Sequence, residues 1–271
     1  MLKNWLLATR PKTLVASLLP VVAGFLLAYE QSSTVSKGVG LLCFLYCLLV
    51  QIGTNLANDY FDYIKGADLN REHAPVRMVS SGKIRPSAMI LASCLVFLIS
   101  FALGVYIMDF VNGSPYLVTV GLFSVLFGLC YTGGPFPLAY NGLGDVFVIL
   151  FFGFVAVLTT QYATILSTDL KWEPNWVLPL GVGFVINNLL VVNNYRDYEE
   201  DREVGKKTLI VLLGKRFGLG LFLCGVIVST LLIPFLVPSA WSTIFLLPIG
   251  IYSFTKLPKS LIRSDYDKIL S

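Results

Sequence analysis

Apolar runs that are long enough to cross a membrane dominate this chain. Eight of them are close to the roughly 17–25 residues that a transmembrane helix needs. They lie at about 13–30, 38–57, 87–108, 115–132, 143–165, 174–192, 216–236 and 239–255. Only 13% of the 271 residues are charged, compared with about 25% in soluble domains. We therefore predict an all-α fold, a polytopic transmembrane bundle of eight helices that forms one integral membrane domain over residues 1–271.

The Lys and Arg residues are distributed unevenly between the two sides of this bundle. Eighteen of the 20 fall on one side, and only Lys37 and Lys171 fall on the other. Cytoplasmic loops carry the excess of positive charge. We therefore expect the N-terminus and both acidic clusters described below to face the cytoplasm from the inner (plasma) membrane. The stretch MLKNWLLATRPKTL has no small-residue cleavage site, so we expect the first span to remain in the mature protein.

Two clusters of carboxylate and amide side chains follow apolar runs. The first is NLANDYFDYIKGADLN at 55–70, and the second is NNYRDYEEDREVGKKT at 193–208. If the second helix continues to about residue 63, Asp59 and Asp62 share a face, because residues three apart are neighbours on a helix. Asp197 and Asp201, four residues apart, are expected to do the same.

Amide side chains stand next to these acids in both clusters. They are Asn55, Asn58, Asn193 and Asn194. The spacing Asn-xxx-Asp occurs at 58–62 and again at 193–197, so the two clusters resemble two copies of one arrangement.

Carboxylates at membrane depth are costly, and they usually face a cavity or the interior of a bundle. Paired oxygen ligands suit a hard cation, above all Mg²⁺, which shares its coordination with substrate phosphates. Basic residues beside the clusters are Lys65, Arg77, Lys83, Arg196, Lys206 and Lys207. Acid pairs that hold Mg²⁺ among Lys and Arg predict a diphosphate site. The alternative is that each cluster is an ordinary helix end with solvated charges.

The same segments resemble a known family. NDYFDYIKGAD and NNYRDYEEDREVGKKT are similar to the two Asp-rich motifs of the UbiA superfamily of intramembrane prenyltransferases, and most similar to its 1,4-dihydroxy-2-naphthoate polyprenyltransferase branch. RPKTL at 10–14, PVRMVSSGKI at 75–84 and YTGGPFPLAYNGLGDVFVILFFG at 131–153 extend the resemblance. The third acid of the first motif is shifted to Asp68, as in the menaquinone branch. The family typically has nine transmembrane helices, whereas we count eight.

The resemblance implies transfer of a polyprenyl chain from polyprenyl diphosphate to 1,4-dihydroxy-2-naphthoate, with loss of CO₂ and diphosphate. The product would be a demethylmenaquinol, made at the lipid bilayer. The resemblance also implies that carboxylates and an amide hold Mg²⁺ for this chemistry. The implied ligands are Asn58, Asp59, Asp62, Asp68, Asp197 and Asp201.

Other polar residues are assigned to substrate binding. They are Asn55, Asn58, Lys65, Arg77, Lys83, Tyr131, Tyr140, Asp145, Asn193, Asn194, Arg196 and Lys206. Arg77 and Lys83 either grip phosphate or only follow the positive-inside rule. Tyr131, Tyr140 and Asp145 either line an acceptor pocket or pack and cap helix ends. His73, the single histidine, is expected to be solvated in a loop.

Two alternative functions also fit the sequence. One is a related prenyltransferase with another acceptor, such as homogentisate or a glyceryl-phosphate lipid. The other is a membrane transporter, because internal repeats and intramembrane acids also mark transporters. Nucleic acid is not expected as a partner, since the basic residues are interleaved with acids next to membrane spans.

Overall fold

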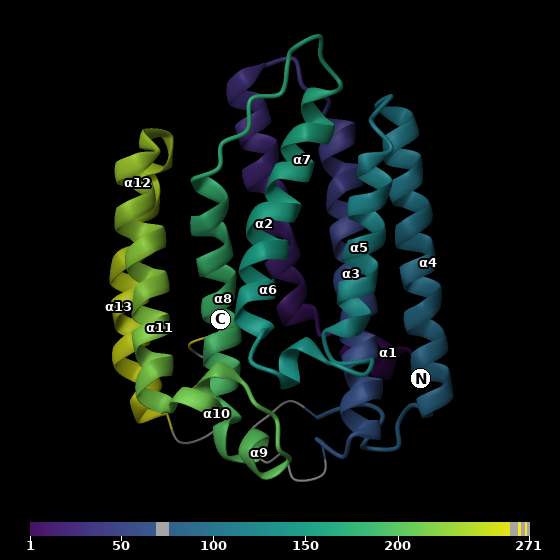
Figure 1. Cartoon of the computed structure of the whole chain (residues 1–271), viewed down its shortest axis with the longest axis vertical. Coiled ribbons are helices and arrows are strands. Elements are labelled where there is room, and N and C mark those ends of the chain that lie inside the picture. Colours follow the sequence, from purple (N-terminus) through teal and green to yellow (C-terminus); the bar gives the residue numbers. More distant parts are fainter. Residues whose placement is uncertain (69–75, 261–264, 267–268, 270–271) are drawn as a thin grey trace.

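The structure, a computed structural model, describes residues 1–68, 76–260, 265–266 and 269. Its long helices stand side by side in one upright bundle (Figure 1). Within these described residues, six helical segments are long and apolar enough to cross a membrane. They are α2 (Pro11–Gln31), α3 (Lys37–Ile64), α4 (Pro86–Phe110), Gly144–Ile165, α8 (Leu178–Arg196) and Lys215–Leu236. The chain is a multi-pass membrane protein, and the predicted all-α bundle is confirmed.

Two of the eight expected spans are shorter than predicted. The run at 115–132 forms α5 (Tyr116–Cys130), which is apolar but has only 15 residues. The run at 239–255 is divided into a 3₁₀ segment, η4 (Pro238–Leu246), and α13 (Leu247–Lys256). Pro248 lies in the first turn of α13. Proline lacks the N–H that a continuous helix would use, so the first turn of a helix is a favourable position for it.

The fifth predicted span is continuous but changes its winding. It consists of α6 (Gly144–Val148), a π-helical stretch η2 (Ile149–Val155) and α7 (Ala156–Ile165). Gly153 in η2 faces the first turns of α8, where a Cβ atom on it would lie 2.5 Å from the Pro179 carbonyl oxygen and 3.0 Å from the Gly183 Cα. The two helices therefore pack backbone to backbone at this point.

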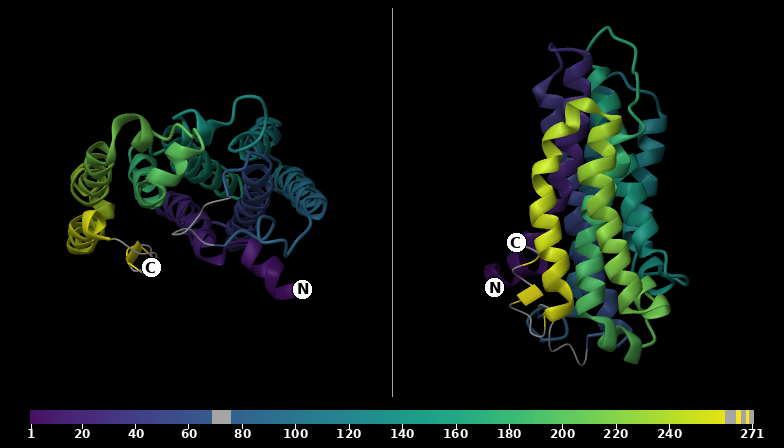
Figure 2. Two further views of the ribbon diagram at one scale, coloured as in Figure 1. Left: turned by 90° about the horizontal axis from the view of Figure 1, so that it is seen from below. Right: turned by 90° about the vertical axis from the view of Figure 1, so that its left-hand side faces the viewer.

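The seventh span also contains a π-helical stretch. It runs through α11 (Lys215–Ile227), η3 (Val228–Leu232) and α12 (Ile233–Leu236). Together with η4 and α13 it forms a hairpin at one side of the bundle (Figure 2). A 3₁₀ turn, η5 (Leu257–Lys259), ends this hairpin.

The end of the bundle distant from the acidic clusters contains packed apolar side chains. Val39, Cys43, Ile107, Val111 and Ala163 form a buried cluster there. The loop 166–177 crosses over this end (Figure 1). Its Glu173 carbonyl accepts hydrogen bonds from the side-chain amides of Gln31 and Gln161, the second at 3.0 Å.

The opposite end carries short elements and both acidic clusters. These elements are η1 (Leu138–Tyr140), α9 (Tyr198–Glu203) and α10 (Leu209–Leu213). The short N-terminal helix α1 (Leu2–Ala8) lies beside the same end (Figure 2). Ala8 packs in a cluster with Leu56 of α3 and with Met78 and Val79 of the segment before α4. His73 lies outside the described residues.

Candidate active site

Two adjoining cavities lie within the bundle, and the polar one is at its acidic end. The first is apolar, with a volume of about 310 Å³, and the second is polar, with a volume of about 180 Å³. They share the wall residues Arg10, Thr13, Asn58, Tyr131, Leu190 and Asn193. The polar cavity therefore meets a long apolar cavity at a junction formed by these six side chains.

The last turns of α3 supply the first part of the polar cavity. Asp62 is buried, and its carboxylate accepts a hydrogen bond from the Tyr140 hydroxyl at 2.7 Å and from Arg77 Nη2 at 2.7 Å. Arg77 Nε also lies 3.5 Å from the carboxylate of buried Asp68. Asn58, one turn before Asp62, accepts a hydrogen bond from the Thr132 hydroxyl at 2.7 Å. The guanidinium of Arg77 therefore stands between two carboxylates of the first cluster.

Asp59 lies in the same cavity wall but has different partners. One carboxylate oxygen accepts the backbone N–H of Met78, and the other accepts that of Val79, both at 3.0 Å. The residue is 2% exposed. Asp59 and Asp62 are thus both buried at the end of α3, as predicted. Asp59 accepts hydrogen bonds from backbone N–H groups, whereas Asp62 accepts them from side chains.

The second cluster forms at a break between two helices. α8 ends at Arg196, and Asp197 stands between α8 and α9, where its carbonyl accepts the Asp201 N–H at 2.7 Å. The Arg196 guanidinium holds the Asp197 carboxylate through two hydrogen bonds, of 2.5 and 2.9 Å. Lys206 Nζ donates to Asp201 at 3.1 Å. Each buried acid of this cluster is therefore held by a neighbouring cation.

Tyr140 connects the two clusters. Its hydroxyl donates to Asp62, while its ring centroid lies 4.6 Å from Lys65 Nζ and 5.6 Å from Lys206 Nζ. Its carbonyl accepts the Lys207 N–H at 3.1 Å. Lys65 Nζ also donates to the Thr132 carbonyl. Partial burial lowers the pKa of Lys65, and the negative charge of Asp62 opposes this shift.

The structure brings most of the predicted site residues to the polar cavity. Those that line it are Asn58, Asp59, Asp62, Arg77, Tyr131, Asp145, Asn193, Asn194, Arg196, Asp197 and Lys206. Asp68, Tyr140 and Asp201 contact these residues directly. Lys65 is not among the residues that line either cavity, but its Nζ lies against the Tyr140 ring. Asn55 faces the apolar cavity, where its amide donates to the Thr9 carbonyl at 2.8 Å and the Thr13 hydroxyl at 3.1 Å.

Lys83 is not brought into either cavity. Its residue is exposed, and its backbone N–H donates to the Met78 carbonyl at 3.0 Å. Lys83 and Arg77 flank the same turn, and the turn directs only Arg77 into the polar cavity. The structural placement therefore favours the charge-distribution explanation for Lys83 over phosphate binding.

Arg10 is a site residue that the sequence analysis did not assign. It lines both cavities, and its backbone has φ 53° and ψ 68°, in the left-handed region. Non-glycine residues adopt this conformation at an energetic cost, and such strain clusters at functional sites. Its signal in the sequence is an arginine directly before Pro11, at the start of a membrane span.

The junction between the cavities carries a phenol and a buried acid. Burial raises the pKa of Tyr131, and the negative charges of Asp145 and Asp62 raise it further, while Arg10 opposes them. The phenol therefore stays protonated and able to donate a hydrogen bond. Asp145, 4% exposed, stands close by and lies beside Asn187 of α8.

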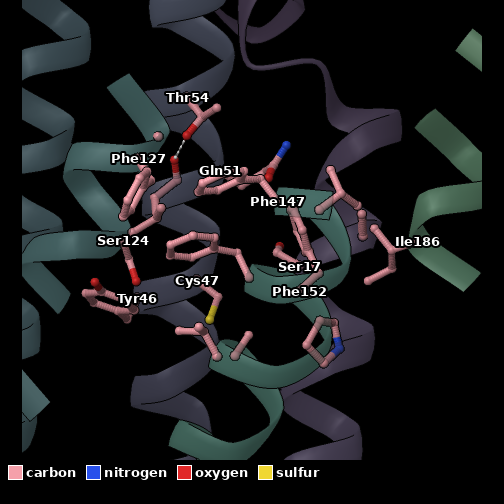
Figure 3. Close-up of a pocket in the computed structure, with 18 of the residues that line it drawn as sticks. Ser17, Tyr46, Cys47, Gln51, Thr54, Ser124, Phe127, Phe147, Phe152 and Ile186 are labelled. Atoms are coloured by element: carbon pink, nitrogen blue, oxygen red, sulfur yellow. Dashed lines mark hydrogen bonds between the residues drawn. The ribbon is translucent and has the colours of Figure 1, made fainter. Parts of the chain in front are cut away.

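The apolar cavity runs beside α3 from Asn58 to Cys43. Fifteen residues of helix correspond to about 22 Å at a rise of 1.5 Å per residue. Phe127 of α5 packs against Phe147 and Phe151 with centroid separations of 5.0 and 5.2 Å. Figure 3 shows Phe127 and Phe147 of this wall together with Cys47 and Gln51 of α3. The cavity is thus long, mostly apolar and aromatic on one side.

The donor chemistry of the polar cavity fits a hard cation. Carboxylate and amide oxygens of Asn58, Asp62, Asn194 and Asp197 line it together, and these are the ligand types that Mg²⁺ prefers. In the part of the chain that the structure describes, however, no three acidic, His or Cys side chains converge as a ready-made metal site. The acids are held instead by Arg77, Arg196 and Lys206. A cation would therefore replace these ion pairs.

A comparison with protein families decides the relationship. The model of the UbiA prenyltransferase family matches residues 17–269. The chain belongs to this family. Membership of the UbiA prenyltransferases confirms the predicted enzyme class and removes the transporter alternative.

Several curated proteins are similar to this UbiA chain. The 1,4-dihydroxy-2-naphthoate octaprenyltransferase of Haemophilus influenzae is 35% identical over 219 residues, which are 79% of this chain and 70% of that protein. A protein of the same name from Escherichia coli is 34% identical over 256 residues, covering 90% and 80%. A 2-carboxy-1,4-naphthoquinone phytyltransferase of Synechocystis is 28% identical over 218 residues, covering 80% and 68%.

Solved structures share the fold. A UbiA homolog from Archaeoglobus fulgidus bound to DMAPP and Mg²⁺ superposes with a TM-score of 0.67 at 18% identity, covering 98% of this chain and 95% of that one. A structure of digeranylgeranylglyceryl phosphate synthase gives a TM-score of 0.59 at 20% identity, covering 99% and 91%. At these identities, the likeness establishes the UbiA fold alone.

Proposed function

We propose that this UbiA enzyme transfers a polyprenyl chain from polyprenyl diphosphate to 1,4-dihydroxy-2-naphthoate, releasing diphosphate and CO₂ and forming a demethylmenaquinol. The observation that carries the proposal is the junction of the two cavities. A charged cavity of about 180 Å³ suits a diphosphate, and it meets an apolar cavity of about 310 Å³ that suits an isoprenoid. Relatives named 1,4-dihydroxy-2-naphthoate octaprenyltransferase, about a third identical to this chain, support this acceptor over homogentisate or a glyceryl-phosphate lipid.

The leaving group would be bound by both clusters. Asn58, Asp62, Asp197 and Asp201 would hold Mg²⁺, with Asp68 behind Arg77. Bound Mg²⁺ would supply neutralisation of the charge that develops on the departing diphosphate. Arg77, Arg196 and Lys206 now pair with Asp62, Asp197 and Asp201 at 2.7, 2.5 and 3.1 Å. On binding, these cations would turn from the carboxylates to phosphate oxygens, for which Arg provides paired donors.

The reacting carbon would lie at the junction. Ionisation of the allylic C–O bond gives a carbocation that water would quench, so the surroundings must be dry and preorganised. Phe127, Phe147 and Phe151 line the apolar cavity next to this point, and aromatic faces attract cations. The acceptor ring would attack the cation there, beside Arg10, Tyr131 and Asp145. Arg10 offers a positive charge for the acceptor carboxylate, and protonated Tyr131 offers a hydrogen bond.

The polar cavity would face the cytoplasm. Lys206 and Arg77 line the polar cavity at the end of the bundle that also carries most of the Lys and Arg residues of the sequence. The positive-inside rule then orients that end inward, across the plasma membrane. A soluble aromatic acceptor made in the cytoplasm would reach the junction without crossing the membrane.

The test is a reconstituted prenyl transfer reaction. Purified protein in lipid nanodiscs would receive Mg²⁺, a polyprenyl diphosphate and, in parallel, dihydroxynaphthoate, homogentisate or a glyceryl phosphate. Of the three acceptors, we expect only dihydroxynaphthoate to give diphosphate, CO₂ and prenylated product. Product with another acceptor, and none with dihydroxynaphthoate, would refute the proposed acceptor while retaining the prenyltransferase class.

A further inference from the structure

Asp59 is engaged in a way that separates it from the other acids of the polar cavity. Its two carboxylate oxygens each accept one backbone N–H, from Met78 and Val79, at 3.0 Å. Met78 and Val79 are both 3% exposed, so these two N–H groups are shielded from water. If Asp59 turned toward a metal ion, both donors would be left buried and unsatisfied, at a cost of about 1–3 kcal/mol each. Asp62, in contrast, is held by side chains that can rotate away.

The segment that Asp59 holds is a compact turn. The Met78 carbonyl accepts the N–H groups of Lys83 and Ile84, both at 3.0 Å, and the Val79 carbonyl accepts that of Gly82 at 2.9 Å. Met78, Val79 and Ile84 pack into the cluster that contains Ala8 and Leu56. The turn is therefore fixed to α3 by apolar packing on one side and by the Asp59 carboxylate on the other.

Arg77 is the residue that this turn delivers to the polar cavity. It directly precedes the two anchored N–H groups, its side chain is 9% exposed, and it lines the cavity. Nη2 and Nε face Asp62 and Asp68, whereas Nη1 has no hydrogen-bond partner among the described residues. An unsatisfied guanidinium N–H inside a cavity is a donor that an anionic ligand can use.

We propose that Asp59 is a positioning residue, not a metal ligand. It fixes the Met78–Val79 turn so that Arg77 points its guanidinium at the ligand of the polar cavity. This inference rests on the proposed function only in naming that ligand as a diphosphate. It assigns different tasks to two adjacent acids, because Asp62 then binds Mg²⁺ while Asp59 acts through Arg77.

The test compares four variants with the wild-type protein in nanodiscs. Asp59→Asn keeps one acceptor oxygen but places an NH₂ group against a backbone N–H. Asp62→Asn, Arg77→Ala and the double variant Asp59→Asn/Arg77→Ala complete the set. Two affinities are measured without any acceptor. Binding of Mn²⁺ alone is followed by electron paramagnetic resonance, and binding of inorganic diphosphate in the presence of Mg²⁺ is followed by calorimetry.

We expect Asp59→Asn to weaken diphosphate binding about tenfold, as loss of a charge-assisted hydrogen bond does, and to leave Mn²⁺ binding unchanged. Asp62→Asn should weaken Mn²⁺ binding. The double variant should bind diphosphate no more weakly than Arg77→Ala. If Asp59 acts only through Arg77, its substitution has no further effect once Arg77 is absent. If Asp59→Asn does not fold, Asp59→Glu keeps both acceptors on a longer side chain and carries the same two expectations.

A loss of Mn²⁺ affinity in Asp59→Asn as large as that in Asp62→Asn would overturn the proposal, as would additive effects in the double variant. These measurements need no prenyl transfer. Failure of dihydroxynaphthoate as an acceptor would therefore leave the positioning role standing, and loss of the positioning role would leave the proposed reaction standing.

Discussion

The hydroxyl of Tyr140 donates a 2.7 Å hydrogen bond to the carboxylate of Asp62. The same ring lies between Lys65 of the first cluster and Lys206 of the second. One side chain from the segment between α5 and α6 thus contacts two Asp-rich clusters that are far apart in the sequence. We expect this contact to align the helix ends that carry the clusters.

Substitution of Tyr140 by Phe tests this alignment. The ring and its contacts with the two lysines remain, and only the hydrogen bond to Asp62 is lost. Hydrogen bonds to charged groups contribute about 1.5–3 kcal/mol, so we expect kcat/KM for prenyl diphosphate to fall about 10- to 100-fold. Steady-state kinetics would measure it. Unchanged kinetics in Tyr140→Phe would show that the ring alone aligns the clusters.

Removal of the metal should abolish turnover, and loss of either central acid should mimic it. Treatment with EDTA should stop the reaction, and added Mg²⁺ should restore it. Asp62→Asn and Asp197→Asn should each lower kcat by about 10²-fold or more, because a catalytic metal contributes several kcal/mol of charge stabilisation. Asp109→Asn is the control, because Asp109 is exposed and lies at the end of α4 distant from the acidic clusters. Turnover in EDTA at the same rate as with Mg²⁺ would refute the metal requirement.

The apolar cavity should select isoprenoid length. Cys47 lines it, whereas Cys94 on α4 is exposed. Cys47→Trp should therefore reduce turnover of a polyprenyl diphosphate about tenfold more than that of dimethylallyl diphosphate, a difference of ~1.4 kcal/mol. Cys94→Trp is the matched control and should change neither. Equal losses for both substrates in Cys47→Trp would place the isoprenoid elsewhere.

The close approach of η2 and α8 should make Gly153 intolerant of any side chain. A Cβ atom there would meet the Pro179 carbonyl oxygen at 2.5 Å. Gly153→Ala should lower the free energy of unfolding by about 1–3 kcal/mol, the usual cost of overpacking. Among the described residues, no atom lies within 4 Å of a Cβ position on Gly220 of α11, so Gly220→Ala should have little effect. Thermal unfolding in detergent would compare the two.

Orientation can be tested with two surface lysines. Lys83 lies at the acidic end of the bundle and Lys171 in the loop over the opposite end, and both are exposed. In intact cells, a membrane-impermeant maleimide should label Lys171→Cys and spare Lys83→Cys, and permeabilised cells should give both signals. Labelling of Lys83→Cys from outside would reverse the proposed topology.

The sequence predicted the membrane bundle and the pairing of its acidic clusters, because hydropathy and the repeated Asn-xxx-Asp spacing are local signals. It did not separate Asp59 from Asp62. Their difference depends on the turn that carries Met78 and Val79, and contacts between distant segments leave no mark in local spacing. The left-handed backbone of Arg10 was missed for a related reason, since tertiary packing holds a conformation that intrinsic preference disfavours.

The apolar cluster at the end distant from the acidic clusters has a consequence for the ion permeability of the membrane. Among the described residues, the apolar cavity reaches Cys43, Ile107 and Ala163 of that cluster, beneath the loop that Gln31 and Gln161 hold in place. Apolar side chains offer no hydrogen bonds to water or ions, so passage beyond this point would be costly. We therefore expect the enzyme to bind a charged substrate from the acidic end without conducting ions across the membrane.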